Sequence, residues 1–276
     1  MGRLEELVGV ETDLARVSGI VQEFARTLGA PVVGAYHVTC SDESEWECAQ
    51  AFQQSFAQAV LPALKQGRRA VFRSVNLGAR YEAGAIGIAE QHFATGESQK
   101  SFKLMVVKIN AHVAVRTTPA GPQYGWMDRY HTRSPCCGAL AALVAGADLP
   151  AARELADLFA SGGKDRLAVV KDPGAVPEEH RALVAAMVNA RLQADAAIRD
   201  IQTHRPASPT IFLVLPCVTV NRPGPDTEVV VGRYGVDWTG PAPTTKYEGL
   251  GDDPAAYSMR HQHGRLVVTD HQWPRG

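Results

Sequence analysis

The sequence has no long apolar run and no excess of charge of either sign. Its 276 residues include 28 basic and 29 acidic side chains, and no basic run is longer than Arg68-Arg69. A nucleic-acid-binding surface normally needs clustered Lys and Arg. A membrane-spanning helix needs roughly 20 consecutive, mainly apolar residues. We therefore expect a soluble protein that acts on neither nucleic acid nor membranes.

Cysteine is scarce and is not arranged for disulfides or for a compact metal knuckle. There are five cysteines, an odd number, and no CxxC pair occurs. The segment Met1–Glu6 also lacks the basic and then apolar pattern of a signal peptide. We therefore expect a cytoplasmic protein whose thiols are reduced, and hence buried, catalytic or bound to metal.

Strand and helix patterns alternate along the first half of the chain. Apolar residues recur at helical spacing up to Leu28, and Gly29 is a typical residue to end a helix. The expected helices cover residues 11–28, 43–64 and a segment through 86–89, and the expected strands cover residues 32–39, 69–75 and 102–115. This alternation favours an α/β fold with a mainly parallel sheet flanked by helices.

The second half has a different pattern. Residues 116–135 show no clear period and are interpreted as a long functional loop. Helices are expected from Cys137 onward and over residues 151–160 and 177–203, strands over 210–220 and 227–237 as an additional hairpin, and an edge strand over 266–269. No repeat or domain boundary is evident, so a single α/β domain over residues 1–276 is expected.

Three cysteines occur at positions suited to chemistry. Cys40 ends an expected strand, where open α/β sheets place their ligands, and Asp42 follows in the same turn. Cys136 and Cys137 precede an expected helix, whose dipole favours the thiolate that binds metal or attacks a substrate. The alternative for each thiol is simple burial. We expect that alternative for Cys136 and a functional role for Cys137.

His112 lies in an otherwise apolar strand and needs a polar partner there. Such a histidine is often only a hydrogen-bonded core residue, but Cys40 and Cys137 are expected at the ends of neighbouring elements. A Cys2His set with an open fourth position is a catalytic zinc arrangement, whereas structural zinc sites close with four protein ligands. The candidate ligands are 72 and 25 residues apart, so the fold has to assemble them.

Four motifs in a fixed order carry a resemblance to a known family. They are the Cys40-Ser41-Asp42 turn, Gly78-Ala79-Arg80-Tyr81-Glu82-Ala83-Gly84 before a helix ending in His92, Ala111-His112-Val113-Ala114, and Ser134-Pro135-Cys136-Cys137-Gly138-Ala139-Leu140. Over roughly residues 30–145 the sequence thereby resembles the limiting-CO2-inducible B/C family, whose members are relatives of the β-type carbonic anhydrases.

The resemblance implies a β-carbonic-anhydrase-like fold, a tight homodimer or pseudo-dimer, and Zn2+ bound by Cys40, His112 and Cys137. Cys137 is chosen over Cys136 because a Cys-Gly step follows the second thiolate ligand in β-type enzymes. The implied activity is the hydration of CO2 to bicarbonate, in which zinc lowers the pKa of bound water to roughly 7. Asp42 would orient the resulting hydroxide, or occupy the fourth zinc position in a resting form.

The sequence departs from the ordinary β-type pattern at two positions. Ser134 replaces a histidine, which the family resemblance explains because His112 supplies the nitrogen ligand. Ser44 replaces an arginine two residues after Asp42, and without that partner Asp42 can close the zinc site. Arg80 is the candidate replacement, because a guanidinium could hold a carboxylate away from the metal. The alternatives are a solvated turn role for Arg80 or a pairing by Arg116, Arg129 or Arg133.

Two further groups of residues have open interpretations. Tyr124, Trp126, Tyr130 and His131 precede Cys137 and could form a pocket wall, shuttle protons or seal a dimer interface. Three histidines near the end of the chain, at 261, 263 and 271, suggest a second metal site by composition, but a frayed polar tail is the preferred interpretation.

Three functions compete. The first is a zinc carbonic anhydrase acting on CO2 and bicarbonate. The second, motivated by Ser44, is a non-catalytic zinc protein of the same fold that binds CO2 or bicarbonate or acts as a scaffold. The third is a thiol enzyme without metal, in which Cys136 or Cys137 is a nucleophile and a histidine acts as base.

Overall fold

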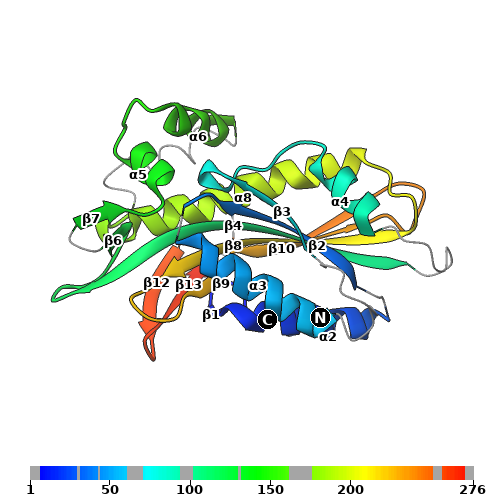
Figure 1. Ribbon diagram of the computed structural model, residues 1–276, viewed down its shortest axis with the longest axis horizontal. Coiled ribbons are helices and arrows are strands. Elements are labelled where there is room, and N and C mark those ends of the chain that lie inside the picture. The colour runs from blue at the N-terminus through cyan, green and yellow to red at the C-terminus, as the bar shows by residue number, and fades with distance from the viewer. Residues whose placement is uncertain are drawn as a thin grey trace.

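The sheet at the centre of the molecule is largely parallel. The computed structural model describes residues 7–29, 32–42, 44–60, 71–93, 102–129, 132–161, 176–250 and 257–270. Within these residues, β3 (Val71–Asn76), β2 (Val32–Cys40), β4 (Lys103–Thr118) and β8 (Thr210–Asn221) lie side by side in that order and run parallel. The mixed α/β architecture predicted from the alternating pattern is confirmed (Figure 1).

Antiparallel strands extend the sheet beyond β8. The strands β9 (Thr227–Val230) and β10 (Gly232–Asp237) both pair with β8, so the predicted hairpin is confirmed with a break at Val231. The short β1 (Glu11–Asp13) pairs with β9, so the helix prediction was wrong for residues 11–13. The strand β11 (Thr244–Gly249), which had not been predicted, pairs with β10.

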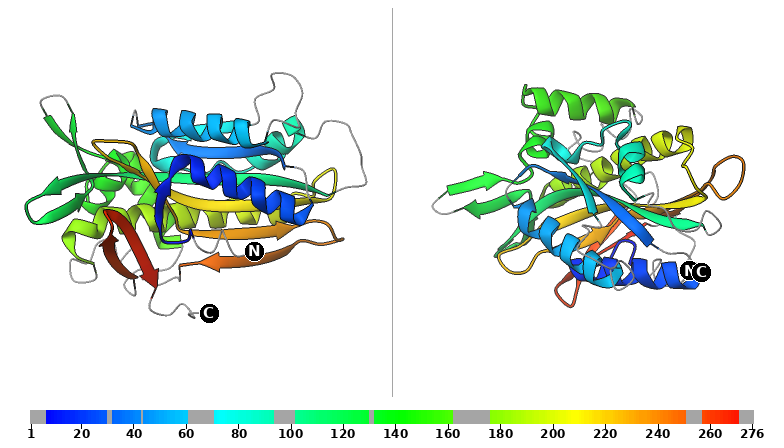
Figure 2. Two further views of the ribbon diagram at one scale, coloured as in Figure 1. Left: turned by 90° about the horizontal axis from the view of Figure 1, so that it is seen from below. Right: turned by 45° about the vertical axis from the view of Figure 1, so that its right-hand side comes forward.

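Helices cover both faces of the sheet. Figure 1 shows α2 (Leu14–Leu28) and α3 (Glu45–Val60) below the central strands and α8 (Glu178–Thr203) above them, and the right-hand view of Figure 2 shows the same layers. The helix α4 (Ala85–Phe93) lies on the α8 side, and α2 ends at Gly29 in the left-handed conformation, as predicted.

Each face of the sheet has its own apolar core. Side chains of a strand point alternately to its two faces. Accordingly, Leu104 and Val106 of β4 join the core beneath α2 and α3, whereas Met105 and Val107 join the core beneath α8. Further along β4 the face toward α3 becomes polar, because His112 and its even-numbered neighbours replace the apolar residues.

The predicted long loop over residues 116–135 contains strands. In its described part, β5 (Gly121–Tyr124) folds back on β4, and β6 (Trp126–Arg129) pairs with β7 (Thr132–Pro135). The loop prediction was wrong because four-residue strands are too short to show an alternating pattern. The helix α5 (Gly138–Val144) begins directly after Cys137, as predicted, and α6 (Pro150–Ser161) follows.

The C-terminal hairpin is a separate two-stranded sheet. Its strands are β12 (Tyr257–Gln262) and β13 (Arg265–Asp270), so residues 266–269 form a strand but not an edge of the central sheet. A buried carboxylate holds the hairpin to β1, because Glu11 accepts a hydrogen bond from the backbone N–H of Leu266 at 2.7 Å. The same carboxylate pairs with Arg222.

The hairpin also changes the interpretation of the C-terminal histidines. The ring of His261 stacks on Tyr124 and shares a 3.1 Å hydrogen bond with its hydroxyl, so a frayed tail is wrong for this segment. His263 lies in the hairpin turn, and His271 lies outside the described residues.

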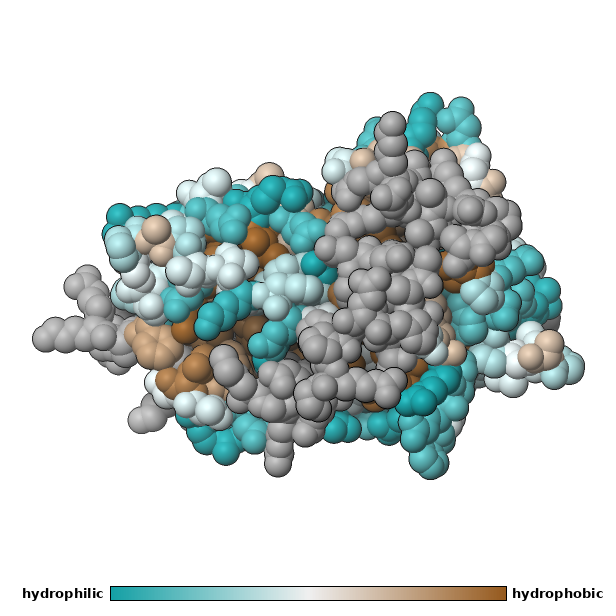
Figure 3. Space-filling model, turned by 180° about the vertical axis from the view of Figure 1, so that it is seen from behind, coloured by the Kyte–Doolittle hydropathy of each residue, from teal (hydrophilic) through white to brown (hydrophobic). Residues whose placement is uncertain are grey.

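The described surface is mainly polar. On the face shown in Figure 3, apolar residues emerge in separate areas between hydrophilic ones. The large exposed apolar side chains of the described part include Trp46 of α3 and Leu77 after β3. Among the described helices, none combines the length and apolar character that a bilayer span needs.

Candidate metal centre

The predicted ligands meet at the carboxyl edge of the parallel strands. The strand β2 lies between β3 and β4, and the chain first turns to one side of β2 and then crosses to the other, which is where such sheets place ligands. Pairing between β2 and β4 extends to Thr39 and Asn110, so His112 lies beyond the end of β2. Cys40 and His112 are therefore neighbours at this edge.

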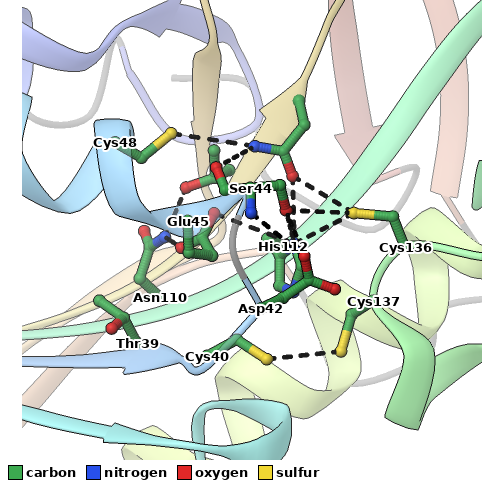
Figure 4. A network of polar contacts seen from close by, with 12 residues as sticks. Thr39, Cys40, Asp42, Ser44, Glu45, Cys48, Asn110, His112, Cys136 and Cys137 are labelled. Atoms are coloured by element: carbon green, nitrogen blue, oxygen red, sulfur yellow. Dashed lines mark hydrogen bonds and ion pairs between the residues drawn. The ribbon is translucent and has the colours of Figure 1, made fainter. Parts of the chain in front are cut away.

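Two thiols and one imidazole form a compact donor set. The Sγ atoms of Cys40 and Cys137 lie 3.7 Å apart. The ligating atoms of Cys40, His112 and Cys137 all lie within 4.8 Å of one another, and the three side chains are buried. Figure 4 shows the two thiols pointing toward each other.

This geometry fits a zinc ion. A tetrahedral ion with Zn–S bonds of about 2.3 Å requires an Sγ–Sγ separation of about 3.8 Å, and the observed separation is 3.7 Å. The Nε2 atom of His112 is buried and has no hydrogen-bond partner among the described residues. A buried, unpaired ring nitrogen is costly unless a ligand or ion occupies its lone pair.

The protonation equilibria of the two thiols also suit a cation. The hydrogen bond from the Cys137 thiol lowers the pKa of Cys40 below its ordinary value, although burial acts in the opposite direction. The pKa of Cys137 is raised well above its ordinary value, because Cys137 donates to Cys40 and is buried. One thiolate is therefore favoured at neutral pH, and the thiolate is the form that binds metal.

Ser44 occupies the position at which the β-type pattern has an arginine. Its hydroxyl donates to Oδ1 of Asp42 at 2.9 Å, and its backbone N–H donates to the same oxygen at 3.2 Å. Asp42 also belongs to a second donor set, with His112 and Cys136. The Asp42 carboxylate is thus held at the site by neutral donors from the turn that begins α3.

The described arginine candidates for pairing with Asp42 have other partners. Arg80 forms an ion pair with Glu154 of α6, and its side chain is half exposed. Arg116 donates to Gln123, and Arg133 lies 3.8 Å from Asp128. The assignment of Arg80 as the partner of Asp42 stays a prediction. The Arg129 side chain and the residues Tyr130 and His131 lie outside the described part.

Three polar residues at the site, Asn221, Glu45 and Asn110, carry no prediction from the sequence. Asn221, at the end of β8, contacts His112 at 3.1 Å. Burial raises the pKa of Glu45 to about 7, and Asn110 donates to this carboxyl group at 2.9 Å. Cys136 is buried as predicted, but its sulfur also lies 3.4 Å from the His112 ring. Polar residues at every second position of β4 were the available signal.

No protein-family model matches the sequence, and no curated protein is similar to it. Among solved structures, PtLCIB4, a homolog of the limiting CO2-inducible protein LCIB, aligns with a TM-score of 0.57 at 14% identity, over 87% of this chain and 96% of that chain. LCIB aligns with a TM-score of 0.50 at 14% identity, over 89% and 98%. The chain has the fold of the limiting CO2-inducible proteins.

This similarity confirms the family resemblance at the level of the fold. A tetrameric β-carbonic anhydrase from Sordaria macrospora aligns over 69% of this chain and 79% of that chain, at 13% identity and a TM-score of 0.34. The roles of the individual site residues rest on the geometry of this chain.

Proposed function

We propose that this protein is a zinc-dependent carbonic anhydrase that interconverts CO2 and bicarbonate. The observation that carries the proposal is the buried set of Cys40, His112 and Cys137, with thiols 3.7 Å apart and an unpaired His112 nitrogen. The fold shared with limiting CO2-inducible proteins supports the substrate class. Three protein ligands leave a fourth position open, as in other catalytic zinc sites.

Cys40, His112 and Cys137 would hold the ion, and Asp42 would act beside it. When bound in such a site, zinc supplies Lewis acidity that makes water a nucleophile at neutral pH. Asp42 would accept a hydrogen bond from the nucleophilic water and so orient it toward the CO2 carbon. Ser44 in turn fixes Asp42, because both of its donors bind the same carboxylate oxygen.

Stopped-flow CO2 hydration by the zinc-loaded, reduced protein tests the proposal. Activity should appear with one zinc per chain and should be lost in Cys40→Ala and His112→Ala. The variant Cys217→Ala is a matched control, because Cys217 is an equally buried thiol in the core beneath α2 and α3. A zinc-loaded protein that does not accelerate hydration at any pH would overturn the proposal.

A non-catalytic zinc protein that binds CO2 or bicarbonate is the second candidate. It is favoured by the second donor set, in which a carboxylate oxygen of Asp42 lies within 4.8 Å of the ligating atoms of His112 and Cys136. In this second candidate Asp42 would complete the coordination of the ion. Stopped-flow CO2 hydration by the zinc-loaded protein across pH distinguishes the two, because a site that Asp42 keeps closed has no coordination position for water.

A homodimer, a single domain and a cytoplasmic location belong to the same proposal. All three follow from the sequence patterns and the family resemblance. Light scattering on the purified protein gives the oligomeric state directly. A mass of one chain, 29.7 kDa, would contradict the homodimer.

A further inference from the structure

The two nitrogens of the His112 ring have different surroundings. Nδ1 lies 3.1 Å from Oδ1 of Asn221, 3.3 Å from Oγ of Ser44, 3.4 Å from Sγ of Cys136 and 4.0 Å from a carboxylate oxygen of Glu45. Nε2 is buried without a hydrogen-bond partner among the described residues. The shortest contact of the ring is therefore to Asn221, on a strand 109 residues further along the chain.

Neighbouring acceptors fix the orientation of the Asn221 amide. Its Nδ2 lies 3.2 Å from the backbone oxygen of Ser44 and 3.2 Å from Oδ2 of Asp226. A backbone carbonyl and a carboxylate only accept hydrogen bonds, so the NH2 group has to face them. Oδ1 of Asn221 is left facing His112, and because an amide oxygen only accepts, Nδ1 has to carry a proton there.

Asp226 is itself held in place. Its Oδ1 accepts the backbone N–H of Arg222 at 3.1 Å, and its Oδ2 accepts the thiol of Cys48 at 2.8 Å. The donors of these two hydrogen bonds belong to the turn after β8 and to α3. Asp226 is thus a fixed hydrogen-bond acceptor. Because Asn221 has to donate to Asp226, its oxygen is the group that faces His112 and accepts from it.

We propose that Asn221 is the positioning residue of the metal centre and that Asp226 sets its orientation. Asn221 accepts the hydrogen bond of the His112 Nδ1–H and thereby directs the Nε2 lone pair toward Cys40 and Cys137. Metal-ligating histidines usually donate their second ring N–H to such an acceptor, which fixes the ring and its tautomer. The inference rests on the zinc binding of the proposed function, but not on CO2 hydration.

The same amide also connects two parts of the site. By donating to the Ser44 backbone oxygen, Asn221 ties the end of β8 to the turn that carries Asp42. One side chain therefore sets the direction of the His112 ring relative to the Asp42 turn. Replacing Asn221 is therefore expected to weaken zinc binding more than replacing a residue that makes a buried hydrogen bond elsewhere.

Proton NMR of the wild-type protein loaded with 113Cd tests which nitrogen binds the metal. Cadmium on Nε2 is three bonds from both carbon-bound ring protons, so both His112 signals should show coupling to 113Cd. Cadmium on Nδ1 is three bonds from the Hε1 proton alone. Coupling confined to Hε1 would overturn the proposal, since Nδ1 would then be the ligand.

Zinc affinity, measured by competition with a chromophoric chelator, tests the role of Asn221. Asn221→Ala should bind zinc about 10- to 100-fold more weakly than wild type, as other variants of this type do. The matched control is Asn189→Ala, because Asn189 is also fully buried and donates to a backbone oxygen, that of Gly78, at 2.7 Å. Equal zinc affinities for these two variants would contradict the proposal.

Exchanging the two side chains keeps the test decisive if Asn221→Ala does not fold. In the double variant Asn221→Asp/Asp226→Asn, position 226 donates and position 221 accepts, and position 221 still presents an oxygen to His112. It should bind zinc about tenfold more tightly than Asn221→Asp alone, and no recovery would count against the chain of bonds. Zinc binding without CO2 hydration would sink only the enzyme proposal, whereas a wild-type protein that holds neither zinc nor cadmium would overturn both.

Discussion

Lys108 of β4 and Glu228 of β9 form an ion pair that is closed off from solvent, with side-chain exposures of 1% and 0%. Lys108 Nζ also lies 4.6 Å from the centre of the Phe52 ring of α3. Burial alone would lower the pKa of Lys108, but Glu228 raises it above its ordinary value. Lys108 lies four residues before His112 in β4, and its side chain is on the same face of that strand.

Removing one partner of this ion pair should be costly. Lys108→Met leaves the Glu228 carboxylate buried without compensation, which typically costs about 3–5 kcal/mol of unfolding free energy. The double variant Lys108→Met/Glu228→Gln should recover most of that loss. Urea denaturation measures both, and Lys103→Met at the less buried start of β4 should stay within about 0.5 kcal/mol of wild type. A single variant as stable as wild type would contradict the buried pair.

Zinc binding should depend on two of the buried thiols. Cys40→Ala and Cys137→Ala should each lose stoichiometric zinc, because the remaining set has only two ligands, whereas Cys217→Ala should retain it. Metal analysis of the purified proteins measures this. Full zinc content in Cys137→Ala together with its loss in Cys136→Ala would show that the second donor set is the one used.

Metal removal should lower stability. A ligand that binds only the folded protein stabilises it by about 2.7 kcal/mol at 100 times its dissociation constant. Chelation should therefore lower the melting temperature of the wild type, and added zinc should restore it. Cys40→Ala should not respond to zinc in this way. A wild-type melting temperature that is insensitive to chelator would contradict a zinc site formed by the fold.

The position of Ser44 offers a test of catalysis. Ser44→Arg gives Asp42 a charged partner that can hold its carboxylate away from the ion. If Asp42 limits the activity by closing the site, CO2 hydration near neutral pH should rise about tenfold. Ser41→Arg in the same exposed turn is the control and should leave the rate unchanged. An equal rate in both variants would show that closure by Asp42 does not limit the activity.

Stability should fall on the acid side because of His37. This ring is fully buried, and burial, Lys108 and Arg73 lower its pKa well below the ordinary value. The unfolded chain takes up the proton near pH 6.5, whereas the folded protein resists it. His37 thus contributes stability above about pH 6.5 that is lost as the pH falls toward its folded pKa, by at most about 1.4 kcal/mol per pH unit.

Urea denaturation at several pH values measures this contribution. In His37→Leu the unfolding free energy should decline less steeply below about pH 6.5. His263→Leu, in the exposed hairpin turn, should keep the wild-type slope. Parallel wild-type and His37→Leu profiles would contradict a neutral, buried His37.

The sequence was informative where local patterns decide the structure. Helical spacing and Gly29 correctly located the body and the end of α2, but not its start, and the parallel strands followed from apolar runs between helices. The grouping of Cys40, His112 and Cys137 was predicted from the two cysteines at the ends of elements, from a histidine in an otherwise apolar strand, and from the family resemblance. The structure brings these three side chains together.

Residues that act through distant contacts could not be found in this way. Asn221 is ordinary in sequence, since a polar residue at the end of a strand usually faces water. Its contact with His112 requires β8 to lie beside β4, which only the tertiary fold specifies. The pairing of Ser44 with Asp42 depends on the shape of one turn, and the preference of Arg80 for Glu154 depends on where α6 packs.

Glu11 makes the assembly of this protein depend on segments far apart in its sequence. Its hydrogen bond to Leu266 joins residues that are 255 positions apart. During synthesis the Glu11 carboxylate therefore lacks this donor until residue 266 has left the ribosome. A nascent chain stalled before the hairpin can pair β1 with β9 and Glu11 with Arg222, but it leaves a carboxylate oxygen that is buried in the folded protein without its N–H donor.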